Sequence, residues 1–407
     1  MDRTSRSPNM SLTVHGIPVI DIDSHYTEPP DLWTSRAPAK YKDAVPHITL
    51  NDEGQQRWTV LDDIDFGPPG FTVVRDDGKK EYGTISLDSF ENMSKAATEP
   101  KARLKMMDSL GVAQQIVYPN VAGFGSQNFV KIEDSELRNT CCTVYNDAIA
   151  EFQAEGEGRL YPQGLVPFWD IPASVEELQR IKDLGMTGIT MCDTPEAFGL
   201  PHLGDAAWDP FWDACQDMEM PVNFHIGAGA GVADKLLWPG YGPQRSLALI
   251  SISLFITNFK VIMNLIFSGL CERYPKINFV SVESGIGWVP FLLEAMDYQF
   301  EETVPTEREG LTMKPSEYFR RQIFASFWFE DFGPRATISA IGEDNVMFET
   351  DFPHPTCLYP RAQEHVTEVL TDLDEGIREK VLRTTAERIY HLPPAPASIY
   401  ESAAAGG

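Results

Sequence analysis

The feature that most constrains the fold is a repeated alternation between short apolar runs rich in β-branched residues and longer amphipathic runs. Runs of the first kind predict buried strands, and runs of the second kind predict helices. The predicted strands cover residues 19–23, 114–119, 160–167, 188–192, 221–225, 277–283, 322–327 and 346–351. Eight strands that alternate with helices predict an α/β fold of the (β/α)8 TIM-barrel type, in which functional sites lie where the strands end.

Helices are predicted between these strands, at residues 100–110, 135–155, 174–184, 210–218, 246–273, 288–300, 334–341 and 363–370. Residues 26–99 depart from the repeat, because strand-like runs at 58–61 and 71–74 are separated by turn signals. They predict a long insertion after the first strand, which could form a wall over the site or serve only as decoration or a dimer contact. We therefore predict an N-terminal arm at 1–16, a barrel domain at 17–392 and a Pro- and Ala-rich tail at 393–407.

Charge narrows the range of partners. The 407 residues include 60 acidic and 33 basic side chains, so the formal net charge is −27. This charge repels nucleic acid and anionic membranes, and the basic residues are scattered along the sequence without forming a patch. We therefore expect a small-molecule substrate, with no nucleic acid and no membrane as a partner.

Cysteine usage and the N-terminal region predict a cytoplasmic location. The six cysteines lack CxxC or other ligand-like spacing, and Cys141 and Cys142 are adjacent on a predicted helix. The first sixteen residues lack the apolar core of a signal peptide. The longest apolar stretch, 247–270, contains Asn258 and Lys260, so we do not expect it to span a membrane.

Side chains that can bind a metal occur at the ends of the predicted strands. Asp23 and His25 stand one residue apart where the first strand ends, so they point to the same face. Similar residues follow three later strands: His225, Glu283, Asp351 and His354. A single buried histidine is usually structural, but several such residues meeting at one end of a barrel predict a metal site.

Four motifs carry a family resemblance. They are Asp-x-His-x-x-Glu-Pro-Pro at 23–30, Pro-Val-x-Phe-His-Ile-Gly at 221–227, Glu-Ser-Gly-x-Gly-Trp at 283–288 and Thr-Asp-Phe-Pro-His at 350–354. In this order they resemble the second amidohydrolase family, the aminocarboxymuconate-semialdehyde decarboxylase-like metal-dependent TIM barrels. The resemblance covers about residues 17–392 and includes Thr-Ala-Glu-Arg-Ile-Tyr at 385–390, which is similar to the family's terminal helix.

The resemblance implies a set of metal ligands. The family's strand-one pair maps onto Asp23 and His25, its strand-five histidine onto His225, and its proton-accepting strand-eight aspartate onto Asp351. These residues could hold one divalent ion, and mixed imidazole and carboxylate ligands do not choose among Zn, Mn and Fe. Such an ion lowers the pKa of a bound water or polarises a substrate carboxylate or carbonyl. The resemblance also implies a homodimer or a complex with a homologous subunit.

Glu283 departs from the family pattern, because characterised members commonly carry histidine at that position. An unperturbed glutamate is a carboxylate near pH 7, so it cannot donate a proton as an imidazolium does. It could instead bind a second metal together with His354, and Asp21 is a further candidate ligand. The predicted fourth strand, 188–192, has no lysine, so the carbamylated-lysine bridge of other amidohydrolases is excluded.

Three functions follow from this ligand set. The first is a metal-dependent hydrolase or nonoxidative decarboxylase of a small carboxylated or aromatic molecule, with Asp351 and Glu283 as catalytic residues. The second is a dinuclear Fe or Mn oxygenase that uses Glu283 and His354 for a second metal. The third is a non-catalytic partner subunit of an active homologue.

A few further residues are candidates for contact with the substrate. Aromatic side chains near the ends of strands six and seven could form an apolar wall or belong to the core: Trp288, Phe327 and Trp328. Asn120 could bind the substrate or form a turn, and His202 could reach the site from its loop or remain solvated. Glu28 could orient His25 through the second ring nitrogen or cap the helix that follows.

Overall fold

The central strands follow one another in chain order. The computed structural model describes residues 13–61, 63–230, 238–396 and 399. One sheet contains the short β1 (Thr13–Val14), β2 (Ile17–His25), β6 (Val112–Tyr118) and β7 (Leu160–Pro162) in that order. A second contains β8 (Gly164–Leu165), β9 (Ile189–Thr190), β10 (Val222–His225), β11 (Phe279–Val282), β12 (Ile323–Phe327) and β13 (Val346–Phe348). All neighbours except β1 and β2 pair in parallel, in agreement with the predicted α/β class.

Hydrogen bonds connect the two sheets at both edges. Gln163, between β7 and β8, donates its backbone N–H to Val117 of β6 at 2.9 Å, so the predicted strand 160–167 is shared between the sheets. At the other edge, the Asp351 N–H donates to the Asp23 carbonyl at 2.9 Å, and Ser24 forms an isolated parallel bridge with Phe352. These contacts bring the end of the last strand against the end of the first.

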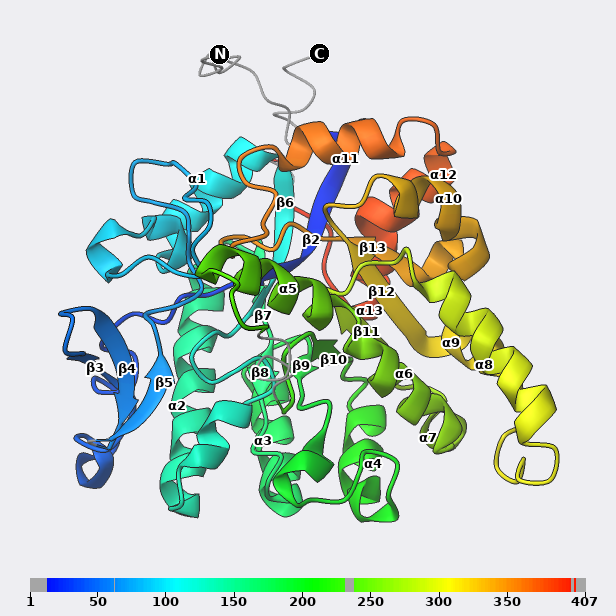
Figure 1. Ribbon diagram of the computed structural model, residues 1–407, viewed down its shortest axis with the longest axis horizontal. Coiled ribbons are helices and arrows are strands. Elements are labelled where there is room, and N and C mark those ends of the chain that lie inside the picture. Colours follow the sequence, from blue (N-terminus) through cyan, green and yellow to red (C-terminus); the bar gives the residue numbers. More distant parts are fainter. Residues whose placement is uncertain (1–12, 62, 231–237, 397–398, 400–407) are drawn as a thin grey trace.

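Helices cover the outside of this strand array (Figure 1). The helices expected from the sequence are present, with bounds close to those predicted: α1 (Pro100–Leu110), α2 (Ser135–Ala154), α3 (Ile171–Asp183), α4 (Asp209–Asp217), α8 (Val289–Thr303), α10 (Phe332–Ile341) and α11 (Ala362–Leu370). The predicted helix 246–273 is instead divided into α5 (Pro243–Phe255), α6 (Asn258–Phe267) and α7 (Leu270–Arg273). Gly269 separates the last two because it adopts φ 74°, which ends a right-handed helix. The sequence did not predict α9 (Pro315–Gln322), and the C-terminal helical region consists of α12 (Glu375–Glu379), a π-helical turn at Lys380–Thr384 and α13 (Thr385–Ile389).

The segment between β2 and α1 forms its own small sheet. Its strands β3 (His47–Leu50), β4 (Gln56–Val60) and β5 (Ile64–Gly67) pair in antiparallel fashion and lie to one side of the molecule (Figure 1). The predicted strand at 71–74 is wrong, since Val74 makes only an isolated bridge with Lys80. Instead, the Val73 N–H donates to the Pro353 carbonyl at 3.0 Å, which holds this segment against the end of the eighth strand.

Apolar side chains fill the space between strands and helices, and all six cysteines are buried and unpaired. The helical run Pro243–Phe267 is long and apolar enough to cross a membrane, by length and composition alone. One such helix is weak evidence for a membrane protein. Here α6 packs Val261, Ile262 and Leu265 inside the molecule, whereas α5 crosses in front of the strand ends in Figure 1.

Candidate metal centre

A cluster of histidine and carboxylate side chains is buried where the parallel strands end. Asp23 and His25 come from β2 and His225 from β10, while Glu283 follows β11 and Asp351 follows β13 by three residues. Ligand-capable atoms of Asp23, His25, His225 and Glu283 all lie within 4.8 Å of one another. A second group that meets the same criterion contains His25, Glu283, Asp351 and His354. The chain therefore brings together all the metal-capable residues predicted at the strand ends.

Both histidines of the first group present the Nε2 atom to the cluster. The Nδ1 atom of His25 lies 3.1 Å from the Pro119 carbonyl, and that of His225 lies 2.8 Å from the Ile226 carbonyl. Donation from Nδ1 to these carbonyls leaves lone pairs on the two Nε2 atoms, which are 3.1 Å apart. Burial lowers the pKa of His25 well below its usual value and that of His225 to about 4. Both rings are therefore in the neutral form that binds metals.

The carboxylates place negative charge beside the two imidazole rings. Asp23 Oδ1 lies 3.4 Å from the Nε2 atoms of both His25 and His225, and Glu283 Oε2 lies 3.4 Å from that of His225. Both carboxylate oxygens of Asp23 and Oδ1 of Asp351 are buried without a hydrogen-bond partner. Unpartnered buried carboxylate oxygens beside two imidazole lone pairs are what a divalent cation satisfies, so these residues fit a metal ion.

The electrostatics of the carboxyl groups support the same conclusion. Burial raises the pKa of Asp23 well above its usual value, and the charges of Asp351 and Asp21 add to the effect. Burial also raises the pKa of Glu283, with repulsion from Asp351, Asp23 and Glu349 as the next causes. These groups repel one another when all are ionised, and a bound cation removes that repulsion.

Backbone strain accompanies two of these carboxylates. Glu283 and Asp351 adopt φ values of 54° and 58°, in the left-handed region that residues other than glycine rarely occupy. Such a conformation costs on the order of 1–3 kcal/mol and often accompanies function. In both cases the left-handed residue lies where the chain changes direction after a strand, β11 for Glu283 and β13 for Asp351.

His354 is held between Asn120 and Asp351. Its Nε2 lies 2.7 Å from Asn120 Oδ1, and its Nδ1 lies 3.0 Å from Asp351 Oδ1. The Asn120 amide nitrogen donates to the Tyr26 carbonyl at 3.0 Å, so its oxygen faces the ring and accepts. The His354 Nε2–H therefore donates to Asn120, and burial lowers the pKa of the ring, so its Nδ1 lone pair faces Asp351 Oδ1. Both atoms are therefore free to face a cation, as their place in the second ligand group indicates.

Two acidic residues near the cluster have structural partners. Asp21 accepts hydrogen bonds from Thr350 N–H at 2.8 Å and from the Gln115 side chain at 2.8 Å, so it ties strands together and is not available as the extra ligand considered above. Glu28 accepts from the N–H groups of Asn120 and Val121 at 2.9 and 3.0 Å. It therefore fixes the loop after β6 and does not orient His25, whose Nδ1 faces a backbone carbonyl.

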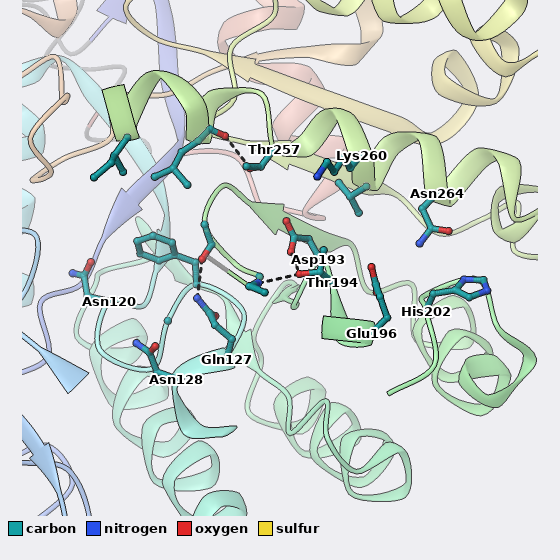
Figure 2. Close-up of a pocket in the computed structure, with 18 of the residues that line it drawn as sticks. Asn120, Gln127, Asn128, Asp193, Thr194, Glu196, His202, Thr257, Lys260 and Asn264 are labelled. Atoms are coloured by element: carbon teal, nitrogen blue, oxygen red, sulfur yellow. Dashed lines mark hydrogen bonds between the residues drawn. The ribbon is translucent and has the colours of Figure 1, made fainter. Parts of the chain in front are cut away.

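Two cavities lie next to the cluster. The smaller, the metal-side chamber, has a volume of about 160 Å³ and is lined by Glu283, His354 and Thr356 together with apolar side chains that include Phe71, Phe124 and Leu254. The larger, the distal chamber, has a volume of about 540 Å³ and a mixed lining, in which apolar side chains such as Val261 accompany the polar residues Asn120, Asp193, Thr194, Glu196, His202 and Lys260 (Figure 2).

Phe124 separates the cluster from the distal chamber. Its ring lies 4.3 Å from that of His225 and 5.1 Å from that of His25, between ring centroids, and it lines both chambers. Sequence reasoning missed this residue because it follows the second strand by six residues, in a loop whose path a sequence does not fix. The signal available was its place in a loop that leaves the C-terminal end of a strand.

The predicted substrate residues divide into two sets. Asn120 and His202 line the distal chamber. Among the residues lining the two chambers, the predicted aromatic wall of Trp288, Phe327 and Trp328 is absent. Phe327 and Trp328 are fully buried core residues, and Trp288 Nε1 donates to the Ser284 carbonyl at 2.8 Å. The apolar wall comes instead from Phe71, Phe124 and α5.

The fold and the cluster define a class of protein: an α/β chain of parallel strands that holds a cation-binding group of histidines and carboxylates at their C-terminal ends. Within this class the chain belongs to the amidohydrolase family, whose model matches residues 20–392. It is an enzyme of that superfamily, and the family leaves the reaction open.

Several known proteins are similar to this chain. Gamma-resorcylate decarboxylase from Rhizobium sp. (strain MTP-10005) is 24% identical over 319 residues, which cover 71% of this chain and 86% of that protein. An amidohydrolase from Mycobacterium avium subsp. paratuberculosis superimposes with a TM-score of 0.71 at 20% identity, covering 91% of this chain and 98% of that one. The 5-carboxyvanillate decarboxylase from Novosphingobium aromaticivorans, solved with manganese and 4-hydroxy-3-methoxy-5-nitrobenzoic acid, gives a TM-score of 0.60 at 20% identity over 73% of this chain and 82% of its own.

Proposed function

We propose that the protein is a metal-dependent nonoxidative decarboxylase of an aromatic carboxylate. The observation that carries this proposal is the buried cluster of histidines and carboxylates that adjoins a small apolar chamber. An apolar chamber beside a cation site suits a flat ring that bears a carboxylate. The decarboxylases of resorcylate and carboxyvanillate among the similar proteins support the same reaction. We further propose that the strands close into a single (β/α)8 barrel, as the contacts between β2 and the end of β13 suggest.

We propose that Asp23, His25, His225 and Asp351 hold one divalent ion, with Glu283 beside it. When bound, the ion supplies positive charge that orients the substrate and stabilises negative charge on its oxygens. The two groups of possible ligands share His25, whose Nδ1 already faces the Pro119 carbonyl. Because only its Nε2 is free to bind a metal, both groups cannot use this ring for separate ions. This geometry favours one ion over the dinuclear alternative.

The chain's own residues would then supply a proton. In the proposed reaction the bond between the ring carbon and the carboxyl carbon breaks, CO₂ leaves, and the electron pair stays on the ring carbon, which takes up a proton. Glu283 and His354 are the titratable side chains of the ligand groups that line the metal-side chamber. Burial raises the pKa of Glu283, so this carboxyl would carry the proton at the chamber wall. General acid catalysis of this kind contributes about 10²–10⁴-fold to a rate.

The decisive experiment measures products from manganese-loaded protein. A panel of aromatic carboxylates that includes 2,6-dihydroxybenzoate and 5-carboxyvanillate would be incubated without oxygen in D₂O. We expect CO₂ release, with one deuterium on the ring carbon that lost the carboxyl group, and no activity in Asp23→Asn. A requirement for O₂, or ¹⁸O from water in an organic product, would exclude this reaction in favour of oxygenation or hydrolysis.

The metal itself is tested by elemental analysis of protein purified without added ions. We expect about one equivalent of a divalent transition metal, with manganese as the first candidate because it is bound in the similar decarboxylase. Close to two equivalents would contradict the single-ion proposal. A Glu283→Gln variant with unchanged metal content and activity would remove Glu283 from the mechanism.

We propose that the protein is a homodimer. Large apolar side chains are exposed on neighbouring segments, including Ile252 of α5, Ile256 just after it, and Phe329, whose ring lies 5.4 Å from that of Phe255 between centroids. Exposed apolar side chains that lie near one another often mark an interface between protein chains. Light scattering after size exclusion would test this, and a monomer mass at micromolar concentration would contradict it.

A further inference from the structure

We propose that the distal chamber is a subsite for the non-reacting end of the substrate, and that it takes a neutral tail that both donates and accepts hydrogen bonds, such as a hydroxyl or a carboxamide. This proposal rests on the proposed function only in placing the reacting carboxylate at the metal-side chamber. It specifies a substrate longer than a single substituted ring.

The two chambers are adjacent and share walls. Phe71, Phe124, Ile250 and Leu254 line both of them. The metal-side chamber, at about 160 Å³, is small beside the range of about 300–1,000 Å³ that is typical of ligand sites, whereas the distal chamber, at about 540 Å³, falls within it. A substrate that occupies only the metal-side chamber would leave most of the available space unused.

The chain after the metal ligand His225 leads directly to the polar end of the distal chamber. Gly227 and Gly229 both line this chamber, and Gln127 donates to the Gly227 carbonyl at 2.8 Å. A Cβ atom on Gly229 would lie only 1.7 Å from Asp193 Oδ1, so only glycine allows the backbone to pass this close to the carboxylate. The loop after β9 is thereby packed against the loop that follows His225.

Hydrogen-bond acceptors lie on one side of the distal chamber and hydrogen-bond donors on the other. Asp193, 8% exposed, and Thr194 point from the loop after β9 toward α6, which carries Lys260 and Asn264 on the other side (Figure 2). Thr194 Oγ1 donates to Asp193 Oδ1 at 2.9 Å. Burial raises the pKa of Asp193 to about 6, and the nearby charge of Lys260 opposes that rise.

This arrangement selects a neutral tail with both donor and acceptor atoms. Asp193 and Glu196 repel an anionic tail, and the ammonium of Lys260 offsets part of their attraction for a cationic one. A hydroxyl or carboxamide can donate to Asp193 and accept from Lys260 or Asn264, so it leaves neither side unpaired. An aliphatic tail would bury Asp193 without adding a partner, which is unfavourable.

The test measures affinity and not turnover, so that it remains informative if no decarboxylation occurs. Manganese-loaded protein would be titrated calorimetrically with 4-substituted salicylates whose N-(hydroxyalkyl)carboxamide tails increase in length. Each probe is matched by an N-alkyl carboxamide with the same number of heavy atoms. We expect the best hydroxyl-tailed probe to bind at least about tenfold more tightly than its match, as a hydrogen bond to a charged group allows.

Substitutions in the distal chamber test whether Asp193 and Lys260 cause the preference for a hydroxyl tail. Asp193→Asn and Lys260→Met should each reduce the preference for the hydroxyl tail by about fivefold or more, while salicylate itself binds as before. The exposed residues Asp183 and Lys105 offer matched controls, Asp183→Asn and Lys105→Met, which should keep the full preference. Thermal melting of each variant confirms folding. Equal binding of both tails at every length, or a preference that survives both distal variants, would overturn the proposal. Loss of CO₂ release with a retained tail preference would overturn only the proposed reaction.

Discussion

Glu28 offers a test of how burial and hydrogen bonding set the energetics around the candidate site. Its side chain is fully buried, Oε1 accepts two backbone N–H groups, and Oε2 has no hydrogen-bond partner. Burial raises the pKa of Glu28 from 4.5 to about 7, against the opposing effect of those hydrogen bonds. The folded protein therefore holds a proton on this carboxyl over a pH range in which the unfolded chain has released it.

Because folding raises the pKa of Glu28, this group stabilises the protein most at low pH. A carboxyl whose pKa is raised by folding contributes stability that is complete below its unfolded pKa and is lost as the pH rises through its folded pKa. The two pKa values differ by about 2.5 pH units, and each unit corresponds to about 1.4 kcal/mol. Wild-type protein should therefore lose about 3 kcal/mol of stability from this one group between pH 4.5 and pH 7, and little more above pH 7.

The Glu28→Gln variant isolates this contribution. A glutamine oxygen can still accept from the N–H groups of Asn120 and Val121, but the amide does not titrate. The free energies of unfolding of both metal-free proteins would be measured with urea by circular dichroism at intervals from pH 4.5 to pH 8.5. The stability of wild type relative to the variant should fall by about 1.4 kcal/mol per pH unit and then level off near pH 7. A difference that does not change with pH, or that grows in favour of wild type as the pH rises, would refute the reasoning.

Three further predictions concern the metal centre and the chambers. Asp23→Asn should weaken metal affinity at least about tenfold, measured in competition with a chelator, because even residues that only hydrogen-bond to a metal ligand commonly change affinity by this factor. An unchanged affinity would exclude Asp23 as a ligand. Asn120→Leu removes the acceptor of His354 Nε2, so kcat should fall about tenfold to a hundredfold with a displaced pH profile, whereas an altered KM alone would contradict this role. Gly229→Ala must displace Asp193, so it should destabilise the protein by about 1–3 kcal/mol in urea unfolding and remove the preference for a hydroxyl tail; wild-type stability would show that the contact is absent.

The sequence by itself determined the class of fold and the metal-capable residues at the strand ends. Alternating hydrophobic periods of strand and helix are local properties, and the side chains of residues 23 and 25 share a face because of the two-residue period of a strand. The order of parallel strands then places their C-terminal ends at one side, so Asp23, His225 and Asp351 could be expected to meet.

Tertiary structure alone decided what each nearby side chain contacts. Sequence could not show that Glu28 would bond to the loop after β6, or that His25 Nδ1 would face the Pro119 carbonyl, because both contacts cross between segments about ninety residues apart. The aromatic wall was predicted on the wrong residues for the same reason: Trp328 is buried against Phe255 and Phe329 and lines neither chamber, while Phe124 reaches the cluster from a loop. Strand periodicity fixes which face a side chain occupies, whereas the path of a loop depends on long-range packing that no local pattern encodes.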